Sequence, residues 1–273
     1  MTASRNRLDL FLVQNGYFST RERAQAAIIA GSVTVNGRMV LKPGYVVNAG
    51  DAIELRVKDH PYVSRGGVKL SHALKFFQPD LTGLTAVDVG ASTGGFTDCL
   101  LEAGIRRVYA IDVGYGQLAW KIRNDPRVVV MERTNIRHLE PSLLGERADF
   151  ATIDVSFISL KKVLPTVDRL LTPAGMGLVL IKPQFEAGRQ KVGKKGVVKD
   201  PSTQLSVCNE IIGFIRDLGW EVLGLTFSPL RGPEGNIEFF VFFSKIPGQA
   251  WHGSVEEVVT QAWNHFKNDR GSR

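Results

Sequence analysis

The sequence predicts a doubly wound α/β sheet preceded by a small mixed domain, and three observations support this. From residue 84 onward, short apolar segments alternate with longer amphipathic ones, which is typical of parallel strands separated by helices. The last two apolar segments have no helix between them and should therefore form an antiparallel pair. The first 58 residues instead show two short helical patterns followed by short strand patterns.

The predicted small domain covers residues 1–58 and begins with two helices. Apolar residues recur at helical spacing over 7–13, and Gly16 stops this first helix. The Ser-Thr pair at 19–20 can cap a second helix, because either hydroxyl can accept a hydrogen bond from a free N–H of the first turn. We expect that helix to end at Ala30.

Strands complete the small domain. The Asn36-Gly37 dipeptide directly follows the strand pattern at 33–35 and is a strong signal for a tight turn between two strands. A further strand is expected at 53–55. Proline at position 61 discourages continuation of either neighbour, so residues 59–67 are interpreted as a linker.

The larger domain, residues 68–273, should open with a helix at about 68–77. Strands and helices then alternate to the last pair of strands. The predicted strands are 86–89, 108–112, 128–131, 150–155, 176–182, 221–227 and 236–243, and the main predicted helices between them are 160–171 and 203–218.

Positive charge is concentrated at the amino-terminal end. Residues 1–79 hold 11 Lys and Arg against 5 Asp and Glu, an excess of +6 in a chain whose formal net charge is +7. A basic module beside a nearly neutral body indicates a polyanionic partner. A solvated basic surface is the common alternative.

Composition also excludes several classes of protein. The two cysteines, Cys99 and Cys208, form no C-x-x-C motif, and the five histidines form no pair at metal-ligand spacing, so no metal is expected. No segment approaches the ~18 apolar residues that a membrane helix needs. We therefore expect a cytoplasmic protein without a membrane span.

A glycine-rich turn at 87–96 follows the first strand of the large domain and opens a helix, which is where backbone N–H groups can meet a ligand. Its spacing matches neither G-x-G-x-x-G nor a Walker loop. Asp88 would suit an ammonium group, and Asp112 would accept hydrogen bonds from ribose hydroxyls. This favours S-adenosylmethionine over NAD, with a purely structural turn as the alternative. The turn residues expected to bind the cofactor are Gly90, Ala91, Ser92, Gly94, Gly95 and Phe96.

Four charged residues far apart in the sequence, Lys69, Asp154, Lys182 and Glu238, are candidates for catalysis. The alternative is that they are four unrelated surface charges, which is usual for Lys and Glu. The last three, however, interrupt apolar runs. If the four converge, they indicate methyl transfer to a hydroxyl group. A lysine whose pKa is lowered by burial and a neighbouring cation could take the proton, and the carboxylates would hold both lysines.

Several motifs resemble known families. Residues 5–55, with Arg7-Leu-Asp9, Ser19-Thr-Arg21-Glu-Arg-Ala24 and Val35-Asn-Gly37, resemble the RNA-binding domain named after ribosomal protein S4. Residues 62–245 resemble the FtsJ-like 2′-O-ribose methyltransferases. The whole arrangement is similar to the TlyA family, on the motifs Ala91-Ser-Thr-Gly-Gly-Phe-Thr97, Asp112-Val-Gly-Tyr-Gly-Gln-Leu118, Asp154-Val-Ser-Phe-Ile158 and Lys182-Pro-Gln-Phe-Glu186.

The resemblance implies a Rossmann-like class I methyltransferase fold that uses S-adenosylmethionine. It implies 2′-O-methylation of cytidine in ribosomal RNA, in 23S and in some members also 16S, with ribosomal RNA or ribosomal subunits as partners. A helical tail from 254 to about 266 resembles the members that modify both. A non-catalytic RNA-binding or assembly protein is one alternative. A cytolysin is another, because some family members are labelled haemolysins.

The resemblance also implies roles for single residues. Lys182 would be the base, oriented by Lys69, Asp154 and Glu238, and Asp154 would also lie near the cofactor. Asn135 would contact the adenine, with a loop cap as its alternative. Phe157 would stack on the target base, with core packing as its alternative.

A basic loop at 189–199 carries five positive charges and no acid. Its glycines suggest an element that orders on RNA, and a solvated loop is the alternative. The side chains expected to contact RNA are Arg7, Arg21, Arg23, Lys42, Arg65, Phe157, Lys191 and Lys194.

Overall fold

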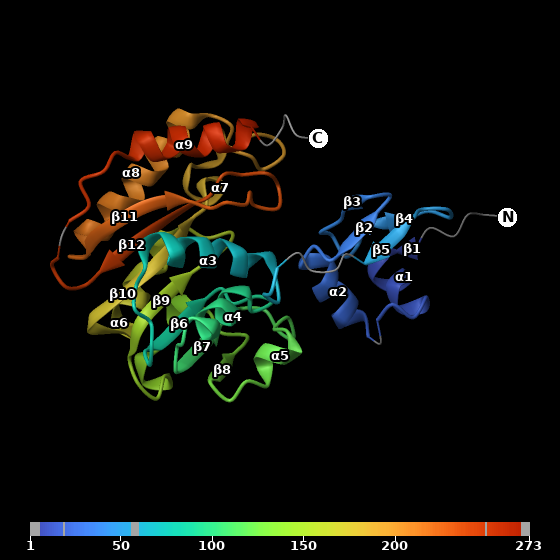
Figure 1. Cartoon of the computed structure of the whole chain (residues 1–273), viewed down its shortest axis with the longest axis horizontal. Helices are drawn as coiled ribbons and strands as arrows, with labels where there is room; N and C mark the ends of the chain where they lie inside the picture. Colours follow the sequence, from blue (N-terminus) through green and yellow to red (C-terminus); the bar gives the residue numbers. More distant parts are fainter. Residues whose placement is uncertain (1–5, 19, 56–59, 249, 269–273) are drawn as a thin grey trace.

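The computed structural model shows a small amino-terminal part beside a larger body (Figure 1). Ser19 and residues 56–59 lie outside the described residues, so the predicted linker 59–67 is described only from His60 onward. The described residues are 6–18, 20–55, 60–248 and 250–268.

The small part has two helices, α1 (Leu8–Gln14) and α2 (Arg21–Ile29), which pack on short strands. Thr20 accepts a hydrogen bond from the backbone N–H of Arg23 at 3.3 Å and so caps α2, as one of the two predicted hydroxyls. The strands are β1 (Asn6–Arg7), β2 (Val33–Val35), β3 (Arg38–Met39), β4 (Val46–Val47) and β5 (Ile53–Leu55), arranged as a β3-β2-β5 sheet and a β1-β4 pair.

The predicted tight turn joins β2 and β3. Asn36 and Gly37 both have positive φ, 52° and 71°, as a two-residue hairpin turn of type I′ requires. Behind the turn, Leu8, Leu12 and Ile28 are fully buried and form the core of the small part together with residues of β2. The helices thus close over the short strands through apolar contacts.

The larger part is built on a seven-stranded sheet in the order β11-β12-β10-β9-β6-β7-β8. Neighbouring strands are parallel except where β12 pairs with β10 and β11. The predicted α/β sheet with an antiparallel last strand is therefore confirmed. Its strands are β6 (Thr85–Val89), β7 (Arg107–Ile111), β8 (Val128–Met131), β9 (Ala148–Ile153), β10 (Leu171–Ile181), β11 (Glu221–Phe227) and β12 (Phe239–Ser244).

Helices cover both faces of this sheet (Figure 1). One face packs against α3 (Arg65–Phe77), α4 (Gly95–Glu102) and α5 (Trp120–Arg123). The other packs against α6 (Leu164–Leu170), α8 (Pro201–Asp217) and the tail helix α9 (Val255–Asn268). The remaining short helices are η1 (Ile136–His138), η2 (Pro141–Leu143), η3 (Leu160–Lys162), α7 (Pro183–Glu186) and η4 (Arg189–Lys191).

The start of α3 differs from the prediction. The helix begins at Arg65 and not near residue 68, so the two glycines belong to its first turn. A Cβ on Gly67 would lie 2.3 Å from the ring of Tyr62. The glycine therefore permits a close contact with the incoming segment and does not break the helix.

The predicted helix 160–171 is two helices, η3 and α6. Pro165 lies at the start of α6, where it has no N–H to continue the hydrogen-bond pattern of η3. Strand β10 then begins at Leu171, five residues earlier than predicted, and its pairing with β9 is irregular between Leu171 and Met176.

Candidate active site

The candidate site lies where the strand order reverses. Strand β6 pairs with both β7 and β9, because the chain runs outward to β8 and returns on the other side of β6. In open α/β sheets this switch point opens a crevice beyond the carboxyl ends of the strands, where ligands bind. The glycine-rich turn follows β6, and Asp154 follows β9.

The turn is shaped by close backbone contacts. Gly90 has φ +90°, and a Cβ there would lie 2.4 Å from the carbonyl oxygen of Asp154. A Cβ on Gly95 would lie 2.2 Å from Oγ of Ser64 and 2.9 Å from the backbone nitrogen of Gly67. Side chains at these positions would push β9 and α3 away, so the glycines keep the crevice walls together.

Asp112 ties the turn to the loop that follows β7. Its carboxylate accepts hydrogen bonds from the backbone N–H of Ser92 at 2.8 Å and of Gly114 at 2.7 Å. The side chain is only partly buried. A carboxylate can accept about four hydrogen bonds, so capacity remains for a ligand hydroxyl.

Three non-glycine residues around the crevice have a left-handed backbone: Ser92 at φ 50°, Arg133 at 53° and Phe157 at 63°. Each such conformation costs on the order of 1–3 kcal/mol, and strain of this kind clusters at functional sites. They follow β6, β8 and β9, so three loops at the same edge of the sheet are held in costly conformations.

The prediction that Asp88 meets a cofactor ammonium group is corrected. Asp88 is fully buried, and its two oxygens accept hydrogen bonds from the hydroxyls of Thr97 at 2.6 Å and Thr152 at 2.9 Å. Burial raises the pKa of this carboxyl to about 7. Asp88 therefore links α4 to β9 beneath the turn, because its position within β6 directs it into the interior.

Asn135 adopts the alternative role considered for it. Its side-chain oxygen accepts a hydrogen bond from the backbone N–H of Arg137 at 3.1 Å and so caps η1. The side chain is otherwise exposed. A contact with adenine stays a prediction.

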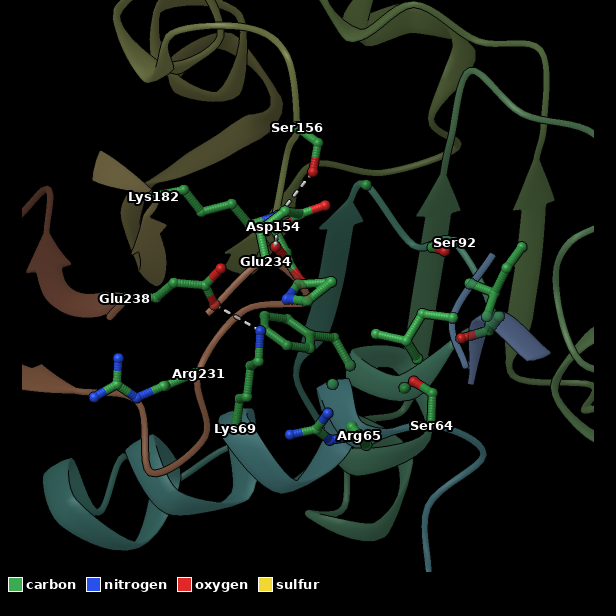
Figure 2. Close-up of a pocket in the computed structure, with 18 of the residues that line it drawn as sticks. Ser64, Arg65, Lys69, Ser92, Asp154, Ser156, Lys182, Arg231, Glu234 and Glu238 are labelled. Atoms are coloured by element: carbon green, nitrogen blue, oxygen red, sulfur yellow. Dashed lines mark hydrogen bonds and ion pairs between the residues drawn. The ribbon is translucent and has the colours of Figure 1, made fainter. Parts of the chain in front are cut away.

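The four charged residues come together as two ion pairs (Figure 2). Nζ of Lys69, from α3, lies 2.6 Å from a carboxylate oxygen of Glu238, which directly precedes β12. Nζ of Lys182, after β10, lies 2.6 Å from Asp154 and donates to Oγ of Ser156 at 2.9 Å. The Lys69–Glu238 pair is buried, with exposures of 8% and 1%.

The charge state of Lys182 differs from the prediction. Burial lowers the pKa of its ammonium group, but the negative charges of Asp154, Glu238 and Glu234 outweigh burial and raise it above its usual value. The sequence shows the cations but not how close the carboxylates lie. Lys182 is therefore protonated near neutral pH in the free protein.

Phe157 is not a core residue. Its side chain is 91% exposed, and its ring lies 5.0 Å from that of Phe185. Both rings line a pocket of about 550 Å³ that also contains Asp154, Lys182 and the glycine-rich turn. An exposed aromatic ring beside a charged pocket is suited to stack on a base.

Sequence reasoning missed Arg231 and Glu234. They come from the irregular loop between β11 and β12, and Figure 2 shows them beside the ion pairs. The loop ends at Glu238, which was already a candidate. The closeness of Arg231 and Glu234 to Glu238 in the sequence was the signal that could have identified them.

Arg7 and Arg21 have a structural role that was not predicted. Both donate to the fully buried carboxylate of Asp9, at 2.9 and 3.0 Å, and Gln25 donates to it at 2.8 Å. These bonds, led by that of Arg7, hold the pKa of Asp9 well below its usual range. Each arginine side chain is still 47% exposed, so contact with RNA stays a prediction.

The other predicted RNA contacts are spread over the surface. Arg23 and Lys42 are exposed on the small part, and Lys191 and Lys194 are exposed on the basic loop. Arg65 begins α3 and lines the pocket, where burial lowers the pKa of its guanidinium group.

Two family models match the chain. The model described as FtsJ-like methyltransferase matches residues 62–245, and the model described as S4 domain matches residues 6–53. The first match covers more than half of the 273 residues, and the chain therefore belongs to the FtsJ-like methyltransferase family. It is a methyltransferase with an RNA-binding type of domain at its amino-terminal end.

Relatives narrow this assignment. The chain is 44% identical to the 16S/23S rRNA (cytidine-2′-O)-methyltransferase TlyA of Mycobacterium tuberculosis, over 95% of this chain and 98% of that protein. It is 48% identical to YqxC of Bacillus subtilis, over 99% of this chain and 98% of that protein. YqxC is named, provisionally, as an rRNA methyltransferase. The predicted resemblance to the TlyA family is confirmed.

A solved structure supports the same grouping. A Streptococcus thermophilus protein provisionally described as a hemolysin is 41% identical, with a TM-score of 0.78 over 98% of this chain and 99% of that one. Within the described ranges, no helix combines the length and apolar character of a membrane span, and no three potential ligand side chains gather as a metal site.

Proposed function

We propose that the protein methylates the 2′-hydroxyl of cytidine in ribosomal RNA, with S-adenosylmethionine as methyl donor. The supporting observation is the pairing of Lys182 with Asp154 and of Lys69 with Glu238 beside the glycine-rich turn. The names of the TlyA relatives supply the nucleoside and the class of RNA. The S4 domain supports an RNA substrate.

The residues of the crevice fit S-adenosylmethionine. Gly90 lets the turn lie directly against the backbone of Asp154, so that the turn and this carboxylate line one pocket. Asp112 retains acceptor capacity suited to ribose hydroxyls. Asp154 would offer its carboxylate to the positively charged sulfonium. When bound, S-adenosylmethionine supplies the methyl group.

Lys182 takes the proton of the 2′-hydroxyl in this proposal. Its Nζ must be neutral to do so, and in the free protein the adjoining carboxylates favour the charged form. Binding of cationic S-adenosylmethionine near Asp154 would offset that negative charge and lower the pKa of Lys182. Asp154 and Ser156 then hold Nζ in position.

The reaction can be tested directly with ribosomal subunits from cells that lack this protein. Purified protein and labelled S-adenosylmethionine should transfer label to ribose, and primer extension at low nucleotide concentration should stop at a cytidine. RNA with 2′-deoxycytidine at that position is the control and should accept no label. Label on a base, or none on either subunit, would refute the proposed function.

Asp112→Ala should weaken S-adenosylmethionine binding roughly 30- to 150-fold, corresponding to about 2–3 kcal/mol for a charge-assisted bond. The loss includes the bonds to Ser92 and Gly114, so the turn should loosen as well. Calorimetry measures the affinity. Asp125→Ala is the control, because the Asp125 carboxylate pairs with Arg127 and makes no bond to the glycine-rich turn. Equal cofactor affinity in the Asp112 variant would remove Asp112 from the cofactor site.

A further inference from the structure

A second cavity, of about 970 Å³, adjoins the candidate active site. Arg231 and Glu234 line both cavities, so both cavities border the loop between β11 and β12. One wall of the second cavity is the part of the basic loop that follows η4, residues 193–199, and the other is α9. We refer to it as the basic groove.

Three lysines of the basic groove, Lys194, Lys195 and Lys199, are exposed and make no ion pair with any residue that the structure describes. Glu234 is the acidic residue in its lining. Among the residues that the structure describes, the lysines that do form ion pairs are Lys69, Lys121, Lys161, Lys182 and Lys245. The groove therefore keeps a net positive charge available for an anion.

Buried amides hold the lysine-bearing loop in place. Asn236 is 1% exposed; its side chain accepts from the N–H of Val198 at 2.9 Å and donates to the carbonyl of Gly196 at 2.8 Å. Gln204, also 1% exposed, donates to the carbonyl of Val198 at 3.1 Å and accepts from the indole N–H of Trp263 at 2.9 Å. The loop is thus fixed between α9 and the segment that leads to Glu238.

Aromatic side chains form the opposite wall. Trp263 and Phe266 of α9 line the groove, and the guanidinium carbon of Arg231 lies 4.6 Å from the centroid of the Phe266 ring. Phe266 is only 4% exposed, whereas Trp263 is partly exposed. A groove with lysines along one side, and an arginine and a partly exposed tryptophan along the other, matches the way proteins bind single-stranded nucleic acid.

We propose that the basic groove binds the single-stranded RNA segment next to the target nucleotide. This inference rests on the proposed function, because a base that leaves its stack to reach Phe157 pulls the neighbouring phosphates toward the pocket. Arg231 lies at the junction of the two cavities, where the strand passes from one to the other. Lys194, Lys195 and Lys199 contact the phosphates that follow.

The test compares Lys194→Ala/Lys195→Ala with the control Lys75→Ala/Arg147→Ala. Each variant loses two exposed positive charges, and neither control residue lines a cavity described here. The probe is a ten-nucleotide oligocytidylate, with a trinucleotide for comparison, titrated from low to high salt. Losing two phosphate contacts should reduce the slope of log affinity against log salt by about 1.4 for the longer probe only.

The proposal requires three further results. The Lys194→Ala/Lys195→Ala variant should match the wild type in its affinity for S-adenosylmethionine and in its thermal midpoint. The trinucleotide should bind this variant and the wild type equally. An unchanged slope for the longer probe, or an equal change in the control variant, overturns the groove assignment. Failure of the proposed function would instead appear as absent methyl transfer by the wild-type protein.

Discussion

Lys182→Ala is expected to reduce methyl transfer roughly 10²- to 10⁴-fold, the range that one general base contributes. The affinities for S-adenosylmethionine and RNA should change little, because the proton is removed only in the transition state. Single-turnover rates at saturating substrates separate the chemical step from binding. Lys161→Ala is the control, because Lys161 forms an ion pair with Glu210 outside the pocket.

The pH dependence follows from the direction of the pKa shift. The pKa of Lys182 is raised in the free protein, so its neutral fraction is small at neutral pH and grows about tenfold per pH unit until the lysine titrates. Bound S-adenosylmethionine would lower the pH at which this rise ends, because its positive charge offsets the negative charge of Asp154. The rate should rise accordingly and then level off. Lys182→Arg should also be inactive, since a guanidinium group keeps its proton. Substantial activity in that variant, with an unshifted profile, would mean that Lys182 only positions the substrate.

Glu238→Leu is expected to lower the free energy of unfolding by about 3–5 kcal/mol, because it leaves the buried ammonium group of Lys69 without its partner. Lys69→Met/Glu238→Leu removes both charges and should recover most of that stability. Urea denaturation monitored by tryptophan fluorescence gives both values. A fully stable single variant would contradict the buried ion pair.

The same double variant separates stability from catalysis. If the pair orients the catalytic groups, the recovered protein should still have a low kcat with little change in KM. Glu210→Leu is the matched control for the stability measurement with Glu238→Leu. It breaks the more exposed ion pair with Lys161 and should lower the free energy of unfolding by less than about 1 kcal/mol. Restored activity in the double variant would reduce Lys69 and Glu238 to a structural role.

Much of the fold could be predicted because apolar periodicity records burial. The strands β6 to β12 follow the predicted apolar segments, and the antiparallel pair followed from a missing helix. The charged residues were found for the same reason: Asp154, Lys182 and Glu238 interrupt apolar runs, and the ends of those runs meet at one edge of the sheet.

Other features depend on contacts that a sequence does not show. An aspartate just before a glycine turn can face either a ligand or the interior, and the sequence is the same in both cases. The hydrogen bonds of Asp88 to two threonines show that it faces the interior. Arg7 was expected to contact phosphate, but Asp9 lies two residues away and takes part of its hydrogen-bonding capacity. The pKa of Lys182 depends on distances to carboxylates that lie far apart along the chain.

At Phe157, the stability of the fold and the proposed function make opposing demands. A large ring that is 91% exposed, on a backbone at φ 63°, lowers the stability of the fold and contributes little to its core. Selection for heat resistance alone would replace it with glycine or asparagine. Its presence means that the fold carries this cost whether or not RNA is bound. In the proposed reaction, a base that leaves its stack would therefore meet a ring that is already exposed, and the RNA alone would set the time needed to expose the base.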